Sequence, residues 1–232
     1  MRHELRTPLN AIIGFSEIMT QEAFGPVTNN KYKEYVRLIY GGGQHLLSLV
    51  NDILLMAKIE AGQHRIKLEP LDFENEVANV VSMTQIQADK RDVRIVSLPV
   101  RPPVRGLADQ ISLQQVLLNL LGNAVKFSPE KGEVRIACGC DANTYAPWIS
   151  VADDGCGIPP ETLERLGKPF VQAEDVYARR NQGTGLGLAI SFRLAEAMNV
   201  RIKIDSEVGR GTRAVLKFPL SAACEPLPRL VA

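Results

Sequence analysis

The sequence N-L-L-G-N-A-V-K-F, residues 119–127, is the first of three stretches that decide the fold. Asn119 and Asn123 are four residues apart, so on a helix both carboxamides point the same way. A hard cation such as Mg²⁺ accepts neutral amide oxygens when phosphates supply the negative charge. Lys126 follows three residues later and could contact such a phosphate. Taken alone this pattern is weak evidence, because polar residues on one face of a half-buried helix are common.

The second stretch is D-D-G-C-G-I-P, residues 153–159, which follows a predicted strand at 148–152. A carboxylate at a strand end, here Asp153, can accept a hydrogen bond from an exocyclic amine such as that of adenine. Gly155 and Gly157 would let the backbone approach the ring closely. The alternative interpretation is the D-G turn of a β-hairpin.

The third stretch is G-T-G-L-G-L-A, residues 183–189, which opens a predicted helix. Glycine-rich backbone before a helix N-terminus presents N–H groups to phosphate. The stretch lacks the lysine of a Walker P-loop, and its spacing differs from that of the Rossmann fingerprint. The polar residues 171–182 before it are predicted to form a lid over a ligand. Arg179 and Arg180 in this lid are either phosphate contacts or a solvated charge pair.

Hydrophobic spacing organises the first quarter of the chain into two helices, at residues 3–22 and 31–61. Two amphipathic helices joined by a short turn form an antiparallel hairpin, which is too thin to bury both faces alone. We therefore expect dimerisation into a four-helix bundle. The seam expected on the second helix consists of Val36, Ile39, Gly43, Leu46, Val50, Ile53 and Ala57. The run Gly41–Gly43 on this helix indicates either a frayed segment, or a hinge or close helix approach.

The hydrophobic period changes after Gly62, which places a domain boundary there. Strands are predicted at 65–69, 93–98, 134–138, 148–152, 201–204 and 213–218, and helices at 73–90, 109–127 and 186–198. Asp109 is a plausible N-cap for the middle helix. The fold class is therefore an all-α hairpin, residues 1–62, followed by an α/β (α+β) sandwich, residues 63–232, with a sheet on one side and helices on the other.

The overall composition excludes several classes of partner. There are 27 Lys and Arg against 26 Asp and Glu, a net charge of +1, so we expect no nucleic-acid partner. The sequence has no apolar run long enough to cross a bilayer and no signal peptide. The four cysteines lack zinc spacing and are expected to be reduced thiols of a cytoplasmic protein.

In this order, the three stretches resemble the N, G1 and G2 boxes of the GHKL nucleotide-binding fold, and Lys168-Pro169-Phe170 matches its F box. Near the start of the chain, H-E-L-R-T-P-L, residues 3–9, resembles the H box of sensor histidine kinases of the HisKA class. The resemblance covers essentially the whole chain. The stretches F-G-P-V-T-N-N-K-Y-K-E-Y and H-L-L-S-L-V-N-D-I-L resemble the alphaproteobacterial cell-cycle kinases of the PleC, DivJ and PdhS type.

This resemblance implies a dimerisation and histidine phosphotransfer hairpin at 1–62 and a catalytic ATP-binding domain at 63–232. His3 would be the phosphoacceptor, and Glu4 would orient its ring and take its proton. Thr7 would help to place a water for dephosphorylating a response regulator, with helix packing as its alternative role. Receiver docking is expected near His3, at an apolar patch around Leu9 and Ile13.

The resemblance also implies that ATP and Mg²⁺ are the cofactors. Asn123 would be the Mg²⁺ ligand, Lys126 would contact phosphate, and Asp153 would bind the adenine amine. The complete set of implied nucleotide contacts is Asn119, Asn123, Lys126, Phe127, Asp153, Gly155, Gly157, Phe170, Arg179, Arg180, Gly183, Thr184, Gly185, Leu186 and Gly187.

The implied function is that of a two-component sensor histidine kinase core, which phosphorylates His3 and passes the phosphoryl group to an aspartate of a response regulator. Whether the core also dephosphorylates that regulator is left open by the sequence. One alternative is a non-catalytic dimeric adaptor that docks receivers. The other is a GHKL ATPase, which would need a glutamate as water base, and no Glu lies between Asp109 and Lys126. Family members begin the first helix well before the histidine, so we expect a fragment whose missing part carries a sensor and any membrane anchor.

Overall fold

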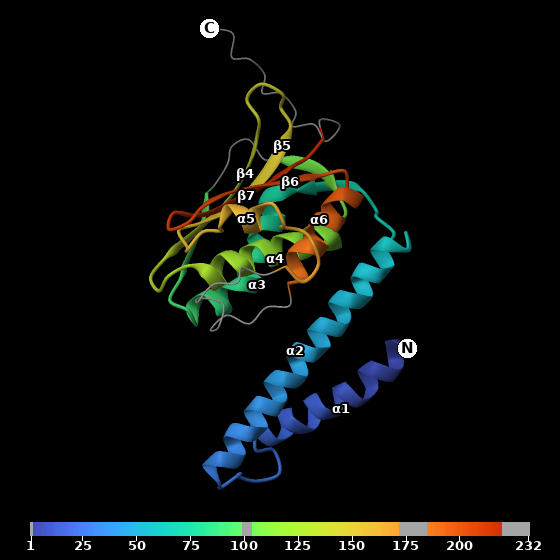
Figure 1. Ribbon diagram of the computed structural model, residues 1–232, viewed down its shortest axis with the longest axis vertical. Helices are drawn as coiled ribbons and strands as arrows, with labels where there is room; N and C mark the ends of the chain where they lie inside the picture. Colours follow the sequence, from blue (N-terminus) through green and yellow to red (C-terminus); the bar gives the residue numbers. More distant parts are fainter. Residues whose placement is uncertain (1, 99–103, 172–184, 220–232) are drawn as a thin grey trace. The chain divides into compact units, whose positions relative to one another are not determined.

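The computed structural model describes residues 2–98, 104–171 and 185–219, with the side chains described from Arg6 onward (Figure 1). The chain divides into two compact units, Met1–His64 and Arg65–Ala232. Within the described residues, no helix combines the length and apolarity needed to cross a membrane.

The first unit is a helical hairpin of α1 (Arg2–Thr20) and α2 (Asn30–Glu60). The carboxamide of Asn29 caps α2 by accepting a hydrogen bond of 2.9 Å from the N–H of Lys31. The two predicted helices are therefore confirmed, with ends that differ by two residues or fewer. Leu9 is only 5% exposed, so the expected docking patch around Leu9 and Ile13 is wrong at Leu9, which packs inside the hairpin instead.

The glycine run does not interrupt α2, which continues through residues 41–43. A Cβ built on Gly43 would lie 2.9 Å from Cγ1 of Ile13, whereas one on Gly41 or Gly42 would meet nothing within 4 Å. Gly43 is also buried. Of the two interpretations left open by the sequence, the close helix approach therefore applies at Gly43, where α1 and α2 touch.

The second unit is built on a five-stranded sheet. The strands of this sheet are β2 (Arg94–Leu98), β4 (Glu133–Cys140), β5 (Pro147–Asp153), β6 (Arg201–Glu207) and β7 (Gly211–Lys217). A separate antiparallel pair consists of β1 (Glu69–Asp72) and β3 (Arg105–Ala108). The order in the sheet is β2-β4-β5-β7-β6, with β2 and β4 parallel and the other neighbours antiparallel. The strand predicted at 65–69 is wrong, because only its last residue lies in β1, and β3 was not predicted.

Helices α3 (Phe73–Asp89), α4 (Gln110–Phe127) and α6 (Gly187–Ala197) cover one face of the sheet, and α5 (Pro160–Leu163) is a short helix after β5 (Figure 1). Asp109 caps α4 as expected, with its carboxylate accepting a 2.9 Å hydrogen bond from the N–H of Ser112. The core between helices and sheet is apolar. Its fully buried members include Leu113, Leu117, Leu121, Ile136, Ile149, Ile190, Leu194 and Leu216. The sandwich predicted from the sequence is therefore confirmed.

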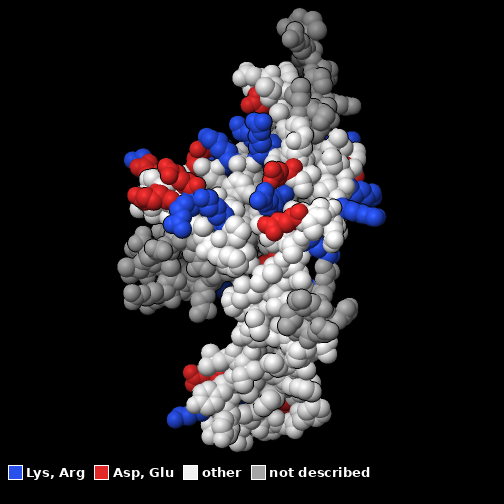
Figure 2. Space-filling view, turned by 45° about the vertical axis from the view of Figure 1, so that its right-hand side comes forward, with Lys and Arg blue, Asp and Glu red and all other residues white. Residues whose placement is uncertain are grey.

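The cysteines differ from the expectation. Cys138 and Cys156 are free thiols, but Cys140 is disulfide-bonded, so the prediction of four reduced thiols is wrong at Cys140. Charges of both signs are interspersed on the face of the second unit in Figure 2. That mixture agrees with the near-zero net charge of the whole sequence.

Candidate functional site

Asn119 joins α4 to the first turn of α6. Its Nδ2 donates to the carbonyl oxygen of Gly187 at 2.9 Å and to Oγ of Ser191 at 3.2 Å. A Cβ on Gly187 would lie 3.5 Å from Cγ of Asn119, an ordinary van der Waals distance, so the contact is close but does not itself require glycine. Sequence motifs 68 residues apart are thus in direct contact.

Asn123 and Lys126 lie further along α4 and are both half-buried. The Asn123 side chain forms no hydrogen bond with another described residue, so its carboxamide oxygen remains available. Burial lowers the pKa of Lys126, and the nearby Arg91 charge lowers it further. Arg91 also donates from Nη1 to the backbone oxygen of Lys126 at 2.5 Å. Sequence reasoning missed Arg91, which follows a helix and belongs to none of the motifs.

Asp153 ends β5 with its carboxylate held by two backbone donors. The Gly155 N–H donates to Oδ1 at 2.9 Å, and the Thr212 N–H also donates to the carboxylate. Burial raises the pKa of Asp153, these two hydrogen bonds oppose the rise, and the neighbouring Asp154 charge adds to it. The site therefore contains a desolvated carboxylate with a defined orientation.

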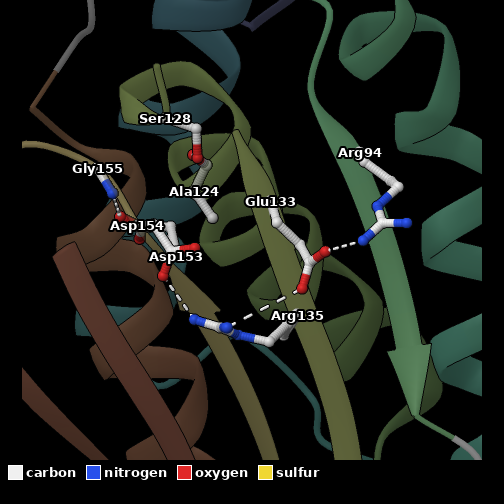
Figure 3. Close-up of polar contacts among 8 residues, drawn as sticks. All are labelled: Arg94, Ala124, Ser128, Glu133, Arg135, Asp153, Asp154 and Gly155. Carbon is white, nitrogen blue, oxygen red and sulfur yellow. Dashed lines mark hydrogen bonds and ion pairs between the residues drawn. The ribbon is translucent and has the colours of Figure 1, made fainter. Parts of the chain in front are cut away.

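The adjacent carboxylate, Asp154, faces another partner. Arg135 lies between two acidic groups, with Nη2 2.5 Å from Oδ1 of Asp154 and Nη1 3.9 Å from Oε1 of Glu133 (Figure 3). Arg94 forms an ion pair with Glu133 on its other side. Such exposed pairs add little stability. The ion pair with Arg135 orients the Asp154 carboxylate towards that arginine, whereas Asp153 accepts its hydrogen bond from the N–H of Gly155.

The loop after β5 needs its glycines because the protein's own backbone lies against them. A Cβ on Gly155 would be 2.6 Å from the carbonyl oxygen of Phe127. Gly157 has a φ of +71°, and a Cβ there would be 2.0 Å from the carbonyl oxygen of Glu207. These two contacts place the loop between the end of α4 and the turn that joins β6 to β7.

The third motif is only partly described. Gly185 has a φ of +70°, and its carbonyl oxygen accepts a 3.1 Å hydrogen bond from the N–H of Phe170, which joins this motif to Lys168-Pro169-Phe170. The Phe170 ring is 66% exposed, and Leu186 is buried. The other predicted contacts, Arg179, Arg180, Gly183 and Thr184, lie outside the described residues.

Thr212 and Ser206 are site residues that sequence reasoning missed. Oγ of Ser206 lies 2.9 Å from Oγ1 of Thr212 and also accepts a 2.9 Å hydrogen bond from the N–H of Ile158. A Cβ on Gly211, which has a φ of +92°, would be 2.0 Å from the carbonyl oxygen of Asp153. The available signal was the turn G-R-G-T at residues 209–212.

The remaining predicted residues belong to the first unit. His3 and Glu4 lie on the first turns of α1, in the part whose side chains are not described, and Thr7 is exposed. Arg6, close to them on α1, donates from Nε to Oδ1 of Asn51 on α2 at 3.2 Å. The predicted site residues thus form two groups, one in each unit.

Two family models match the chain in this same order. The His Kinase A (phospho-acceptor) domain matches residues 1–62, and the histidine kinase-, DNA gyrase B- and HSP90-like ATPase matches residues 108–222. The chain belongs to the histidine kinase family. The family membership and the two-part fold expected from the sequence motifs are therefore confirmed.

Individual histidine kinases resemble the chain over nearly its whole length. The histidine protein kinase DivJ of Caulobacter vibrioides is 41% identical over 96% of this chain, which spans 37% of that protein. The cell-division control histidine kinase PdhS of Brucella abortus is 40% identical over 94% of this chain, which spans 22% of it. The crystal structure of full-length ShkA in complex with AMPPNP is 33% identical, with a TM-score of 0.77 over 94% of this chain and 44% of that one. The chain thus spans less than half of each of these relatives.

Proposed function

We propose that this chain is the catalytic core of a two-component sensor histidine kinase, which uses ATP to phosphorylate His3 and passes the phosphoryl group to an aspartate of a response regulator. The observation that carries the proposal is that α4 contacts both other motifs. Asn119 donates to the carbonyl oxygen of Gly187 at the start of α6, and Gly155, in the loop that follows Asp153, lies against the backbone of Phe127 at the end of α4. The names of DivJ and PdhS, and the AMPPNP in the ShkA structure, support it.

Asp153 would bind the adenine of ATP. Its carboxylate accepts N–H groups from Gly155 and Thr212 and retains acceptor capacity for an exocyclic amine. Because the group is largely desolvated, a hydrogen bond to it is stronger than one made in water. Gly157 keeps the loop close to the strands beside this carboxylate.

The phosphates would lie between α4 and the start of α6. Lys126 supplies a positive charge on a half-buried side chain, and the backbone around Gly185 and Gly187 leads into the N-terminus of α6. Asn123 fits an Mg²⁺ ligand, because its carboxamide oxygen makes no hydrogen bond with another described residue and could bind the ion. Mg²⁺ bound there would neutralise charge on the phosphate oxygens.

The transfer step uses a nitrogen lone pair of the neutral His3 ring. The nitrogen forms a bond to the γ-phosphorus while the bond between that phosphorus and the bridging oxygen breaks, and its electron pair leaves on ADP. The ring proton passes to Glu4. The phosphoryl group then moves to the carboxylate of the regulator. Thr7, exposed one turn after His3, would help to place the water that hydrolyses the aspartyl phosphate of the regulator, releasing phosphate and the free carboxylate.

We also propose that the hairpin dimerises. Ile39, Leu46 and Ile53 recur every seven residues on α2, and their side chains are 52%, 51% and 49% exposed in the single chain. Pairing with a second hairpin would bury this row in a four-helix bundle. A receiver domain of a response regulator would be the second protein partner.

The deciding experiment is incubation of the protein with Mg²⁺ and γ-labelled ATP, with His3→Gln as the matched variant. We expect acid-labile, alkali-stable label on the wild type and none on the variant. Absence of label would be followed by an ATP titration of the same sample. Without Mg²⁺-dependent binding, the kinase proposal fails and the adaptor alternative replaces it.

A further inference from the structure

Arg91 joins the end of α3 to the end of α4. Nη1 of Arg91 donates to the backbone oxygen of Lys126 at 2.5 Å, and both residues are half-buried. Helices α3 and α4 lie side by side on the same face of the sheet (Figure 1). The residue after Arg91, Asp92, accepts a 2.7 Å hydrogen bond from the N–H of Lys131, in the loop that follows α4. The two helix ends are therefore tied together, and these backbone contacts set the place of Arg91.

Capping of α4 accounts for only part of this contact. The last carbonyl groups of a helix lack partners inside it, and the helix end carries about half a negative charge, so one cation there is favourable. The end of α4 has such a cation without Arg91, because Lys126 lies in its last turn, with its ammonium 4.9 Å from the centre of the Phe127 ring. Arg91 adds a second full charge on a half-buried side chain. Two positive charges exceed what the helix end can offset.

The electrostatics of Lys126 agree with this arrangement. Burial lowers the pKa of its ammonium group, and the charge of Arg91 lowers it further. The two cations therefore repel each other at the end of α4. Binding of an anion beside them relieves the repulsion, and the relief grows with the charge of the anion. The pair thus favours an anion of high charge over one of low charge.

The position of the pair on α4 indicates which anion it would meet. Asn123 lies three residues before Lys126, and residues three apart on a helix are neighbours on its surface. The proposed phosphate site lies beside both of these side chains. ATP carries one negative charge more than ADP, and adenosine carries none. A residue that acts through its charge will therefore distinguish the three ligands, whereas a residue that only joins two helix ends will not.

We propose that Arg91 is a positioning residue for the phosphates of the nucleotide, and that it raises the preference of the site for ATP over ADP. It acts through Lys126, whose backbone it fixes at the end of α4 and beside whose ammonium it places a second positive charge that bound phosphate offsets. This inference rests on the proposed function. It adds to that function a residue that belongs to none of the nucleotide-binding motifs.

Three variants separate the charge of Arg91 from its packing. Arg91→Gln removes the charge but retains an amide donor for the Lys126 carbonyl, and Arg91→Lys retains the charge. Lys90→Gln is the matched control, because it removes one positive charge from the adjacent, exposed position. Calorimetric titration of each intact protein with ATP, ADP and adenosine, at one Mg²⁺ concentration, gives the three affinities.

We expect Arg91→Gln to weaken ATP binding about tenfold, as the loss of one interaction with a charged group would. ADP binding should weaken by roughly threefold, since ADP carries less charge, and adenosine binding should be unchanged. Arg91→Lys should keep most of the preference for ATP over ADP. Lys90→Gln should bind all three ligands as the wild type does.

The coupling between the two charges can also be measured without nucleotide. The pH dependence of acetylation by acetic anhydride, followed in the Lys126 peptide by mass spectrometry, reports the pKa of Lys126. Arg91→Gln should raise this pKa towards the ordinary lysine value of 10.5, whereas Lys90→Gln should leave it unchanged.

The outcomes distinguish this inference from the proposed function. If the wild type binds ATP but Arg91→Gln has the same ATP-to-ADP preference as Lys90→Gln, the inference is wrong and the kinase proposal remains. An equal loss of affinity for ATP, ADP and adenosine, with a lower unfolding temperature, would show a purely structural contact and would also overturn the inference. If the wild type binds no nucleotide in the presence of Mg²⁺, the kinase proposal fails and the inference fails with it.

Discussion

Replacing each glycine of residues 41–43 in turn by alanine tests the helix contact that the structure assigns to Gly43. All three lie inside α2, where alanine is favoured over glycine by about 0.5–1 kcal/mol. An added Cβ meets nothing within 4 Å at Gly41 or Gly42. Gly41→Ala and Gly42→Ala should therefore stabilise the hairpin by about that amount.

Gly43→Ala should behave differently. Its Cβ would lie 2.9 Å from Cγ1 of Ile13, well inside the roughly 3.5–4.0 Å at which carbon atoms attract. Either Ile13 leaves its rotamer or the helices separate, and overpacking of this kind costs about 1–3 kcal/mol. After the helix-propensity gain is subtracted, Gly43→Ala should destabilise the hairpin by roughly 0–2.5 kcal/mol.

Urea unfolding of the intact protein can measure this difference. Helical circular dichroism reports both units, whereas the single tryptophan, Trp148, lies in the second unit and reports that unit alone. All variants are compared at one protein concentration, because association would shift the apparent stability. Combining Gly43→Ala with Ile13→Ala should recover part of the loss. Stabilisation of the hairpin by Gly43→Ala equal to that by Gly42→Ala would refute the close contact.

Four further predictions concern the second unit. Asp153→Asn should weaken ATP binding about 10- to 150-fold in a titration, the equivalent of one hydrogen bond to a charged group. Because burial raises the pKa of Asp153, its carboxylate costs stability at neutral pH. That cost disappears as the pH falls through the raised pKa of the folded protein towards the ordinary Asp value of 3.8, because the carboxylate becomes protonated. The free energy of unfolding of Asp153→Asn, measured relative to wild type at several pH values, should therefore decline over that range. Iodoacetamide at pH 8 should alkylate the exposed Cys156 and spare Cys138, whose pKa burial raises to about 11; equal modification of the two peptides in mass spectra would contradict the burial of Cys138. Glu76→Ala should lower the free energy of unfolding by about 2–3 kcal/mol, because this buried carboxylate accepts 2.8 Å hydrogen bonds from two glutamine side chains of α4; a loss below 0.5 kcal/mol would show that water replaces it.

Elements with local signals could be predicted from the sequence. The helix that begins after Asp109 has its N-cap, its apolar face and its last residue within one continuous segment, and the structure reproduces all three. The strand predicted at 65–69 failed because β1 is defined by pairing with β3, in which Glu69 lies opposite Ala108 and Pro70 opposite Leu107. No property of residues 65–69 specifies that register.

By itself the sequence determined the family, the two-part fold and the motif residues Asn119, Asn123 and Asp153, because each of these depends on residue types at short spacings. Only the tertiary structure decided that Asn119 holds the start of α6, that Thr212 supports Asp153, and that Gly43 packs on Ile13. The physical reason is that hydrogen bonds and van der Waals contacts act over a few ångströms in space. Residues distant in the chain become neighbours only when the core has brought their helices and strands together.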